Sequence, residues 1–346
     1  MRRKGLKMAD DVDRTGGGTL GEFDIIARYF APIATDKAAL GLRDDAAILL
    51  ISEGYELIAT CDTLVEGVHF LANDPPVTVG YKALAVNLSD LTAKGARGYA
   101  YLLSLAVPHD TPESWFEGFA SGLRDLQVES GICLVGGDTT ASPGPKTITI
   151  AALGLVTHGH AVLRHGAKAN DRLYVSGTIG DAYLGLRLLE DASLAKSWDL
   201  SEADTNYLTG RYRRPETRAG LVIALRNFAQ AAIDVSDGLV LDTEKLATVS
   251  HAGAVIETAR VPFSPAAQKA LHRAPELLEA MIAGGDDYEI VAAVPETNAA
   301  AFEAEVRAKG APVTLIGRIE GGREGVRVIG PDGAPLKLAR KGFSHF

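Results

Sequence analysis

The chain has 346 residues, of which 47% are hydrophobic and 23% charged, and its formal net charge is −9. At about 150 residues per domain, this length predicts two domains that each bury a core. The acidic balance argues against a nucleic-acid binder, which needs basic side chains to displace counterions. Cys61 and Cys133 are the only cysteines, which excludes a disulfide framework and a four-thiolate zinc site. No apolar run could span a membrane and no apolar signal segment opens the chain, so we expect a cytoplasmic enzyme.

The first 158 residues are expected to form a tail and one domain. Residues 1–20 are polar and rich in glycine, which predicts a disordered tail before a domain over residues 21–158. Within that domain, Leu84, Leu88 and Leu91 recur at helical spacing. The elements predicted in chain order are a helix at Phe23–Phe30, a turn at Gly41–Asp45, a strand at Glu56–Cys61, a helix at Val77–Lys94, a strand at Tyr101–Val107, a helix capped by Thr111 that ends at Gly131, and strands at Ile132–Val135 and Thr147–Val156 around a loop at Gly136–Pro145.

A change of composition at His158–Ala169, rich in Gly, His and Ala, marks the boundary to a second domain over residues 159–346. Strands and helices are mixed in both halves without a strict β-α-β rhythm, so the predicted fold class is α+β. The elements predicted for the second domain are a strand at Arg172–Ser176, helices at Asp181–Glu190 and Pro215–Ala229, a strand at Ala231–Asp234, a helix from Ser236 that stops at Gly253, a strand at 254–257, a loop at Gly284–Tyr288 and a strand at Glu289–Val294.

Aspartates stand repeatedly where a predicted strand or a glycine turn ends. Each one taken singly is more simply explained as a turn residue or a helix cap, and Asp237 before Gly238 is an example. The set as a whole is harder to explain in this way, because charges beside buried strands are costly unless they are paired and few Lys or Arg lie near them. The set comprises Asp44, Asp45, Asp62, Asp90, Asp138, Asp234, Asp237, Asp286 and Asp287.

Divalent cations would balance these carboxylates, and Mg²⁺ commonly shares its coordination shell with substrate phosphates. The glycines of Gly136-Gly137-Asp138 would let the backbone approach a phosphate and donate N–H groups. The chain has no GK[ST] phosphate loop, no H-E-x-x-H and no G-x-S-x-G. The residues alone therefore predict a metal-dependent site for phosphorylated ligands.

Six motifs resemble those of the thiamine-monophosphate kinases, a family of the PurM-like (AIR synthase-like) superfamily. The resemblance extends from residue 21 to the C-terminus, and VEGVHF followed by KALAVNLSD is its most specific part. It implies a PurM-like fold of two domains with the N-terminal domains paired in a homodimer. The motifs are GLRDDAAIL, TCDTLVEGVHF, YKALAVNLSDLTAKGA, LVGGDTT, IDVSDGL and GGDDYE.

The resemblance implies that ATP phosphorylates thiamine monophosphate to thiamine diphosphate, with several Mg²⁺ ions. It assigns a catalytic role to Asp45, Asp62, Asp90 and Asp234. It implies ATP contacts from Gly137, Asp138, Arg164 and Ser236, and substrate contacts from His69, Asp286 and Phe343. The implied magnesium positions are Asp45, Thr60, Cys61, Asp62, Asp90, Asp138, Asp234 and Asp237.

This sequence departs from the family pattern at a few positions. Arg43 stands where the family usually has glycine, and Asp286 replaces a usual glutamate. Cys61 stands at a common threonine position that contributes a backbone carbonyl, so cysteine is compatible with it. Phe343 is the nearest aromatic residue to the one that the family often carries near Arg340.

The acceptor in this reaction is a phosphate oxygen, which is largely deprotonated at neutral pH if its second pKa is about 6. No general base is then needed, and we expect one direct in-line transfer without a phosphoenzyme. Two alternatives from the same superfamily are aminoimidazole ribotide synthetase and selenophosphate synthetase, although the reactive Cys expected before residue 61 in the latter is missing. A nucleotide-binding regulatory subunit without turnover is the non-enzymatic alternative.

Overall fold

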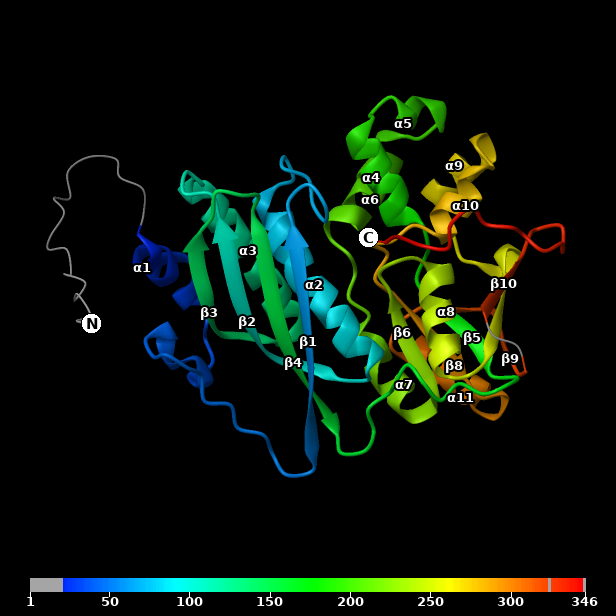
Figure 1. Cartoon of the computed structure of the whole chain (residues 1–346), viewed down its shortest axis with the longest axis horizontal. Coiled ribbons are helices and arrows are strands. Elements are labelled where there is room, and N and C mark those ends of the chain that lie inside the picture. Colours follow the sequence, from blue (N-terminus) through cyan, green and yellow to red (C-terminus); the bar gives the residue numbers. More distant parts are fainter. Residues whose placement is uncertain (1–20, 323–324, 345–346) are drawn as a thin grey trace, which may run out of the picture.

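The structure is a computed structural model that describes residues 21–322 and 325–344. The tail predicted at residues 1–20 lies outside the described residues. Two β-sheets lie side by side, each with its own helices, and Figure 1 shows the chain completing the first sheet before it enters the second. This arrangement confirms the predicted α+β class. Within the described part of the chain, no helix is long and apolar enough to cross a membrane.

The N-terminal sheet has four strands in the order β1-β4-β2-β3, and two long helices cover one of its faces (Figure 1). Short helical turns at residues 22–42 precede it, including α1 (Glu22–Ile25). Its elements are β1 (Tyr55–Val65), α2 (Pro76–Ala93), β2 (Arg97–Val107), α3 (Glu113–Ser130), β3 (Cys133–Ala141) and β4 (Thr147–Thr157).

Helix α2 is the central element of the N-terminal domain. Its predicted apolar stripe is confirmed, since Leu84, Leu88 and Leu91 are buried. It crosses α3 at two glycines, Gly80 and Gly122, where the helix backbones approach so closely that neither position has room for a Cβ atom. This close crossing fixes the position of α2 relative to α3.

Two predictions for this domain are wrong. Residues 136–141 do not form a loop but continue β3, because they pair in parallel with residues 102–107 of β2. Thr111 does not cap α3, since its hydroxyl donates to the carbonyl of Pro108 and Pro112 occupies the N-cap position without a side-chain bond. The predicted end of α3 is confirmed, because Gly131 adopts a left-handed φ of 74° there.

The C-terminal sheet has six strands in the order β10-β7-β9-β5-β8-β6. Its strands are β5 (Arg172–Ser176), β6 (Ala231–Val235), β7 (Gly253–Glu257), β8 (Glu289–Val294), β9 (Val313–Glu320) and β10 (Gly325–Ile329). Its helices are α4 (Asp181–Glu190), α5 (Leu194–Ser197), α6 (Glu202–Arg213), α7 (Val222–Phe228), α8 (Leu239–Val249), α9 (Pro265–Arg273), α10 (Leu277–Ile282) and α11 (Ala299–Ala308).

The predicted strand at Arg172–Ser176 and helix at Asp181–Glu190 are confirmed. The helix predicted to start at Ser236 begins at Leu239 instead. Asp237 does not cap it, because the N-cap is Gly238 and the carboxylate of Asp242 accepts the N–H groups of residues 237 and 238. Helix α6 was not predicted.

The outer face of the N-terminal sheet, opposite α2 and α3, is exposed in the described chain. Along β1 every second residue from Tyr55 to Thr63 is exposed, including Leu57 and Cys61. Leu102 on β2 is exposed on the same face. A sheet face that carries large apolar side chains in this way is typical of a contact surface.

Candidate functional site

A cavity of about 650 Å³ lies between the two domains. Strand β1 and helix α2 line it from the N-terminal domain, and α4, the end of β6 and the loop before β8 line it from the C-terminal domain. The predicted site residues along its wall are Asp62, His69, Asp90, Arg164, Asp234, Ser236, Asp237, Asp286 and Phe343. The fold therefore gathers residues that are up to 281 positions apart in the sequence.

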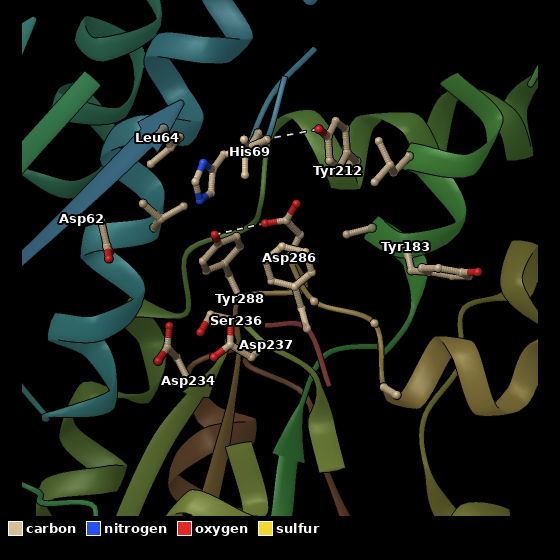
Figure 2. Close-up of a pocket in the computed structure, with 18 of the residues that line it drawn as sticks. Asp62, Leu64, His69, Tyr183, Tyr212, Asp234, Ser236, Asp237, Asp286 and Tyr288 are labelled. Carbon is tan, nitrogen blue, oxygen red and sulfur yellow. Dashed lines mark hydrogen bonds between the residues drawn. The ribbon is translucent and has the colours of Figure 1, made fainter. Parts of the chain in front are cut away.

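Three aspartates from three elements form the acidic end of this cavity. Asp62 lies on the inner face of β1, Asp90 on the facing side of α2, and Asp234 near the end of β6. Figure 2 shows Asp234 beside Ser236 and Asp237, with Asp62 across the cavity from them. The hydroxyl of Thr60 donates to Asp90, so Thr60 also faces this group.

Burial and mutual repulsion perturb these carboxyl groups. Burial, followed by the charges of Asp90 and Asp237, raises the pKa of Asp62 to about 6. Burial and the neighbouring charges of Asp90, Asp242 and Asp62 also raise the pKa of Asp234 well above its ordinary value. Carboxyl groups held together in this state gain strongly from a cation between them.

The two lysines near this group, Lys94 and Lys245, do not balance its full charge. Lys245 pairs with Asp237 and Asp242, so its charge is already shared. Lys94 donates to the carbonyl of Ala232. Burial and the charge of Arg164 lower its pKa to about 8 against the opposing effect of Asp234 and Asp90, so it brings a single positive charge to a group of three carboxylates. The acidic end of the cavity therefore keeps a deficit of positive charge.

The other end of the cavity contains His69 and Asp286 (Figure 2). The ring of His69 accepts the N–H of Val65 at Nδ1, 3.0 Å away, which leaves Nε2 as the donor nitrogen of a neutral ring. Asp286 has a left-handed φ of 70°, and its N–H donates to the carbonyl of Ser236 at 2.9 Å. Phe343, on the C-terminal segment, also lines the cavity. Its backbone N–H donates to the carbonyl of Asp237 at 2.9 Å.

Asp45, Gly137 and Asp138 lie elsewhere, around a second cavity of about 330 Å³ beside β3. The strand register explains the separation, because Asp62 on β1 is aligned with Gly137 across the two intervening strands. Asp62 and Asp138 are thus at opposite edges of one sheet, and their side chains point to opposite faces. Within one chain the structure does not bring these predicted residues together.

Cys61 is exposed on the outer face of β1, so its side chain points away from Asp62 and Thr60. Only its backbone carbonyl is compatible with the magnesium role that the sequence implied. The glycines of β3 also differ from the expected loop. At Gly137 an added Cβ would lie 1.8 Å from the carbonyl oxygen of Leu103, so this glycine is required for strand packing.

The sequence patterns did not predict several residues that line the main cavity or lie next to it. Lys82 lies among apolar residues of α2, and that unusual setting was the only available signal. Tyr212 lies on α6, whose weak amphipathic pattern hid the helix itself. Tyr183 and Arg187 line the cavity from one side of α4, where nothing in their spacing indicated a ligand.

No group of three or more His, Cys, Asp or Glu in the described residues is already arranged to hold a metal ion. The donor chemistry nevertheless fits magnesium. Asp62, Asp90 and Asp234 supply oxygen ligands, they are close enough to perturb one another, and none of them forms an ion pair within the described residues.

Comparison with known proteins identifies the family. The family model for the N-terminal domain of AIR synthase related proteins matches residues 43–156. The model for the C-terminal domain of the same proteins matches residues 168–330. The thiamine-monophosphate kinase of Escherichia coli K12 is 42% identical over 329 residues, which is 94% of this chain and 98% of the relative. The chain belongs to the thiamine-monophosphate kinase family. The family member from Caulobacter vibrioides is also 42% identical, over 95% of this chain and 93% of its own length.

Solved structures of the family share the fold. The thiamine-monophosphate kinase of Stenotrophomonas maltophilia is 38% identical with a TM-score of 0.80, covering 92% of this chain and 98% of that one. AaThiL complexed with AMPPCP and TMP is 32% identical with a TM-score of 0.75, covering 86% of this chain and 89% of its own. These likenesses confirm the two-domain PurM-like fold that the motifs implied.

Proposed function

We propose that this protein transfers a phosphoryl group from ATP to thiamine monophosphate and so forms thiamine diphosphate. The observation that carries the proposal is a single cavity between the domains with two chemically different ends. Its acidic end suits metal-bound phosphates, and its other end presents His69 and Asp286. Family membership at 42% identity supports the same reaction. ATP as the donor favours the cytoplasm as its location.

The two ends divide the proposed roles. At the acidic end, Arg164 and Ser236 contact ATP, since a guanidinium and a hydroxyl both bind phosphate. At the other end, Asp286 faces the cationic thiazolium ring of the substrate, the ring nitrogen of His69 donates a hydrogen bond, and Phe343 packs on the substrate.

Magnesium would be held by carboxylates of Asp62, Asp90, Asp234 and Asp237, with the hydroxyl of Thr60 and the carbonyl of Cys61 beside them. Bound Mg²⁺ supplies charge neutralisation and alignment of phosphate oxygens. These side chains fix where the phosphates of ATP and of thiamine monophosphate meet. With a second pKa of about 6 the acceptor oxygen is largely deprotonated at neutral pH, so no side chain has to remove a proton and the transfer is direct and in line.

The test is an ADP-release assay with γ-labelled ATP. We expect ADP release with thiamine monophosphate and Mg²⁺, none with unphosphorylated thiamine, and none after magnesium is chelated. With labelled ATP alone, the protein should acquire no label, because the transfer is direct. The absence of ADP release with thiamine monophosphate would refute the function, and a labelled protein would refute only the direct mechanism.

We propose further that two copies of the chain complete the site. The exposed apolar face of the N-terminal sheet is suited to stack on a second copy. A twofold axis parallel to the strands, between the two stacked sheets, places β1 of one copy opposite β3 of the other. Residues that are aligned across one sheet then lie at the same level along the strands of the two copies. Because Asp62 is aligned with Gly137 in the sheet, this brings the β3 cavity of one copy, with Asp45 and Asp138, opposite the stretch of β1 in its partner that carries Asp62.

Differently tagged copies carrying Asp62→Asn and Asp138→Asn test this arrangement. Each variant alone should be nearly inactive, whereas the purified mixed dimer should regain roughly half of the wild-type activity, since one of its two sites is intact. As a matched control, a wild-type copy paired with an Asp62→Asn/Asp138→Asn copy should be inactive, because both sites lose a residue. Activity in that control would place the whole site within one chain, and failure to recover any mixed dimer would argue against dimerisation.

A further inference from the structure

Lys82 is a lysine buried in the N-terminal domain, with only 2% of its side chain exposed. It lies on α2 among apolar neighbours, where a charge is costly unless it is paired. Its ammonium group is paired by three contacts, all at residues outside α2. It donates to Asp286 at 3.0 Å and to the carbonyl of His69 at 2.9 Å, and it lies 3.9 Å from the ring centroid of Tyr212.

The contact with Asp286 helps to fix a carboxylate that projects from a strained loop. Both Asp286 and Tyr288 have left-handed φ values, 70° and 50°, which residues other than glycine rarely adopt. Lys82 holds one carboxylate oxygen, and the hydroxyl of Tyr288 donates to the other at 3.1 Å (Figure 2). Each oxygen keeps a lone pair, and 25% of the side chain remains exposed, so the carboxylate is oriented but still able to meet a ligand.

The contact with His69 fixes the second residue at the same end of the cavity. The carbonyl of His69 accepts from Lys82 and also from the hydroxyl of Tyr212 at 3.4 Å. The ring of His69 is held separately by the N–H of Val65. One ammonium group therefore sets the relative position of His69, from the N-terminal domain, and Asp286, from the C-terminal domain.

A second ion pair also joins the two domains, so the contact between the domains does not depend on Lys82 alone. Arg213 on α6 pairs with Asp74 just before α2 at 2.6 Å, and the side chain of Asp74 is 2% exposed. That pair also links the two domains, but neither partner lines the cavity. Lys82 is distinguished from it because it contacts both residues proposed to meet the thiamine end of the substrate.

We propose that Lys82 is a positioning residue which holds Asp286 and His69 in one arrangement and thereby sets recognition of the thiamine end of the substrate. This inference rests on the proposed function. Lys82 does not line the cavity and touches no reacting atom. It acts through the two residues that it holds, and the nucleotide end of the cavity lies outside its contacts.

The first test is Lys82→Met, which keeps the length of the side chain and removes its charge. We expect the KM for thiamine monophosphate to rise about tenfold or more, the effect of one lost charge-assisted hydrogen bond. The KM for ATP should stay within about twofold. The matched control Arg213→Met removes an interdomain ion pair away from the cavity and should leave both KM values near those of the wild type. Equal rises in both KM values, or the same change in the control, would overturn the proposal.

The second test compares Asp286→Asn with Asp286→Asn/Lys82→Met, and it applies even if Lys82→Met alone fails to fold, because the double variant leaves no unpaired charge. The contact of Lys82 with His69 is to a backbone carbonyl that also accepts from Tyr212, so we expect most of the effect of Lys82 to pass through its ion pair with Asp286. The two proteins should then differ less than about threefold in their KM for thiamine monophosphate, although both are weaker than the wild type. A further tenfold rise on adding Lys82→Met would refute the coupling. A wild-type protein that releases no ADP with thiamine monophosphate would instead refute the proposed function.

Discussion

Replacing Asp90 with asparagine is expected to lower kcat about a hundredfold while the protein stays folded. Asp90 lies on α2 opposite Asp62 and Asp234, and its repulsion contributes to the raised pKa of both. Asparagine keeps the shape and can still accept the hydroxyl of Thr60, but it removes one of the charges proposed to hold magnesium. Activity should therefore require a higher magnesium concentration. The measurement is kcat over a magnesium titration.

The stability of the same variant distinguishes loss of function from misfolding. In the metal-free protein the substitution removes repulsion from Asp62 and Asp234, so the melting temperature should be equal to or higher than that of the wild type. As a control, Asp110→Asn changes an exposed carboxylate outside the cavity and should leave kcat unchanged. Near wild-type turnover of Asp90→Asn at ordinary magnesium concentrations would show that Asp90 has no part in the site.

The second large effect is expected for Gly122→Ala, which should destabilise the protein by about 3 kcal/mol or more. Gly122 lies where α3 crosses α2, and an added Cβ would lie 1.9 Å from the carbonyl oxygen of Val77 and 2.8 Å from the nitrogen of Tyr81. These are backbone atoms of a helix and cannot move singly, so the two helices must separate. Thermal unfolding should show a drop in melting temperature of about 6–12 °C, at roughly 2–4 °C per kcal/mol.

Gly210→Ala is the matched control for this prediction. Gly210 lies inside helix α6, but an added Cβ would meet no atom of the described residues within 4 Å. Alanine has the higher helix propensity, so this variant should gain up to about 1 kcal/mol. If Gly122→Ala melted at the wild-type temperature, the close crossing of α2 and α3 would be wrong, and with it the fixed position of Asp90 and Lys82.

Local patterns in the sequence predicted the elements whose structure depends on local rules. The apolar stripe of α2 and the glycine at the end of α3 have signals within a few residues, and both were confirmed. Residues 136–141 were predicted to be a loop because glycine usually breaks strands. They form part of β3 because residues 102–107, more than thirty positions earlier, supply their hydrogen bonds. Helix α6 is stabilised by packing in the tertiary structure, which its polar sequence did not indicate.

The sequence by itself determined the family, the two-domain class and the chemical types of the candidate site residues, because these depend on which residues stand in short motifs. Tertiary structure decided which of them meet. Asp62, Asp90 and Asp234 share one cavity because β1, α2 and β6 converge there, whereas Asp138 points to the opposite face of the sheet because side chains alternate along a strand. The contacts of Lys82 with Asp286 span 204 residues, so only the packing of α2 against the second domain could reveal them.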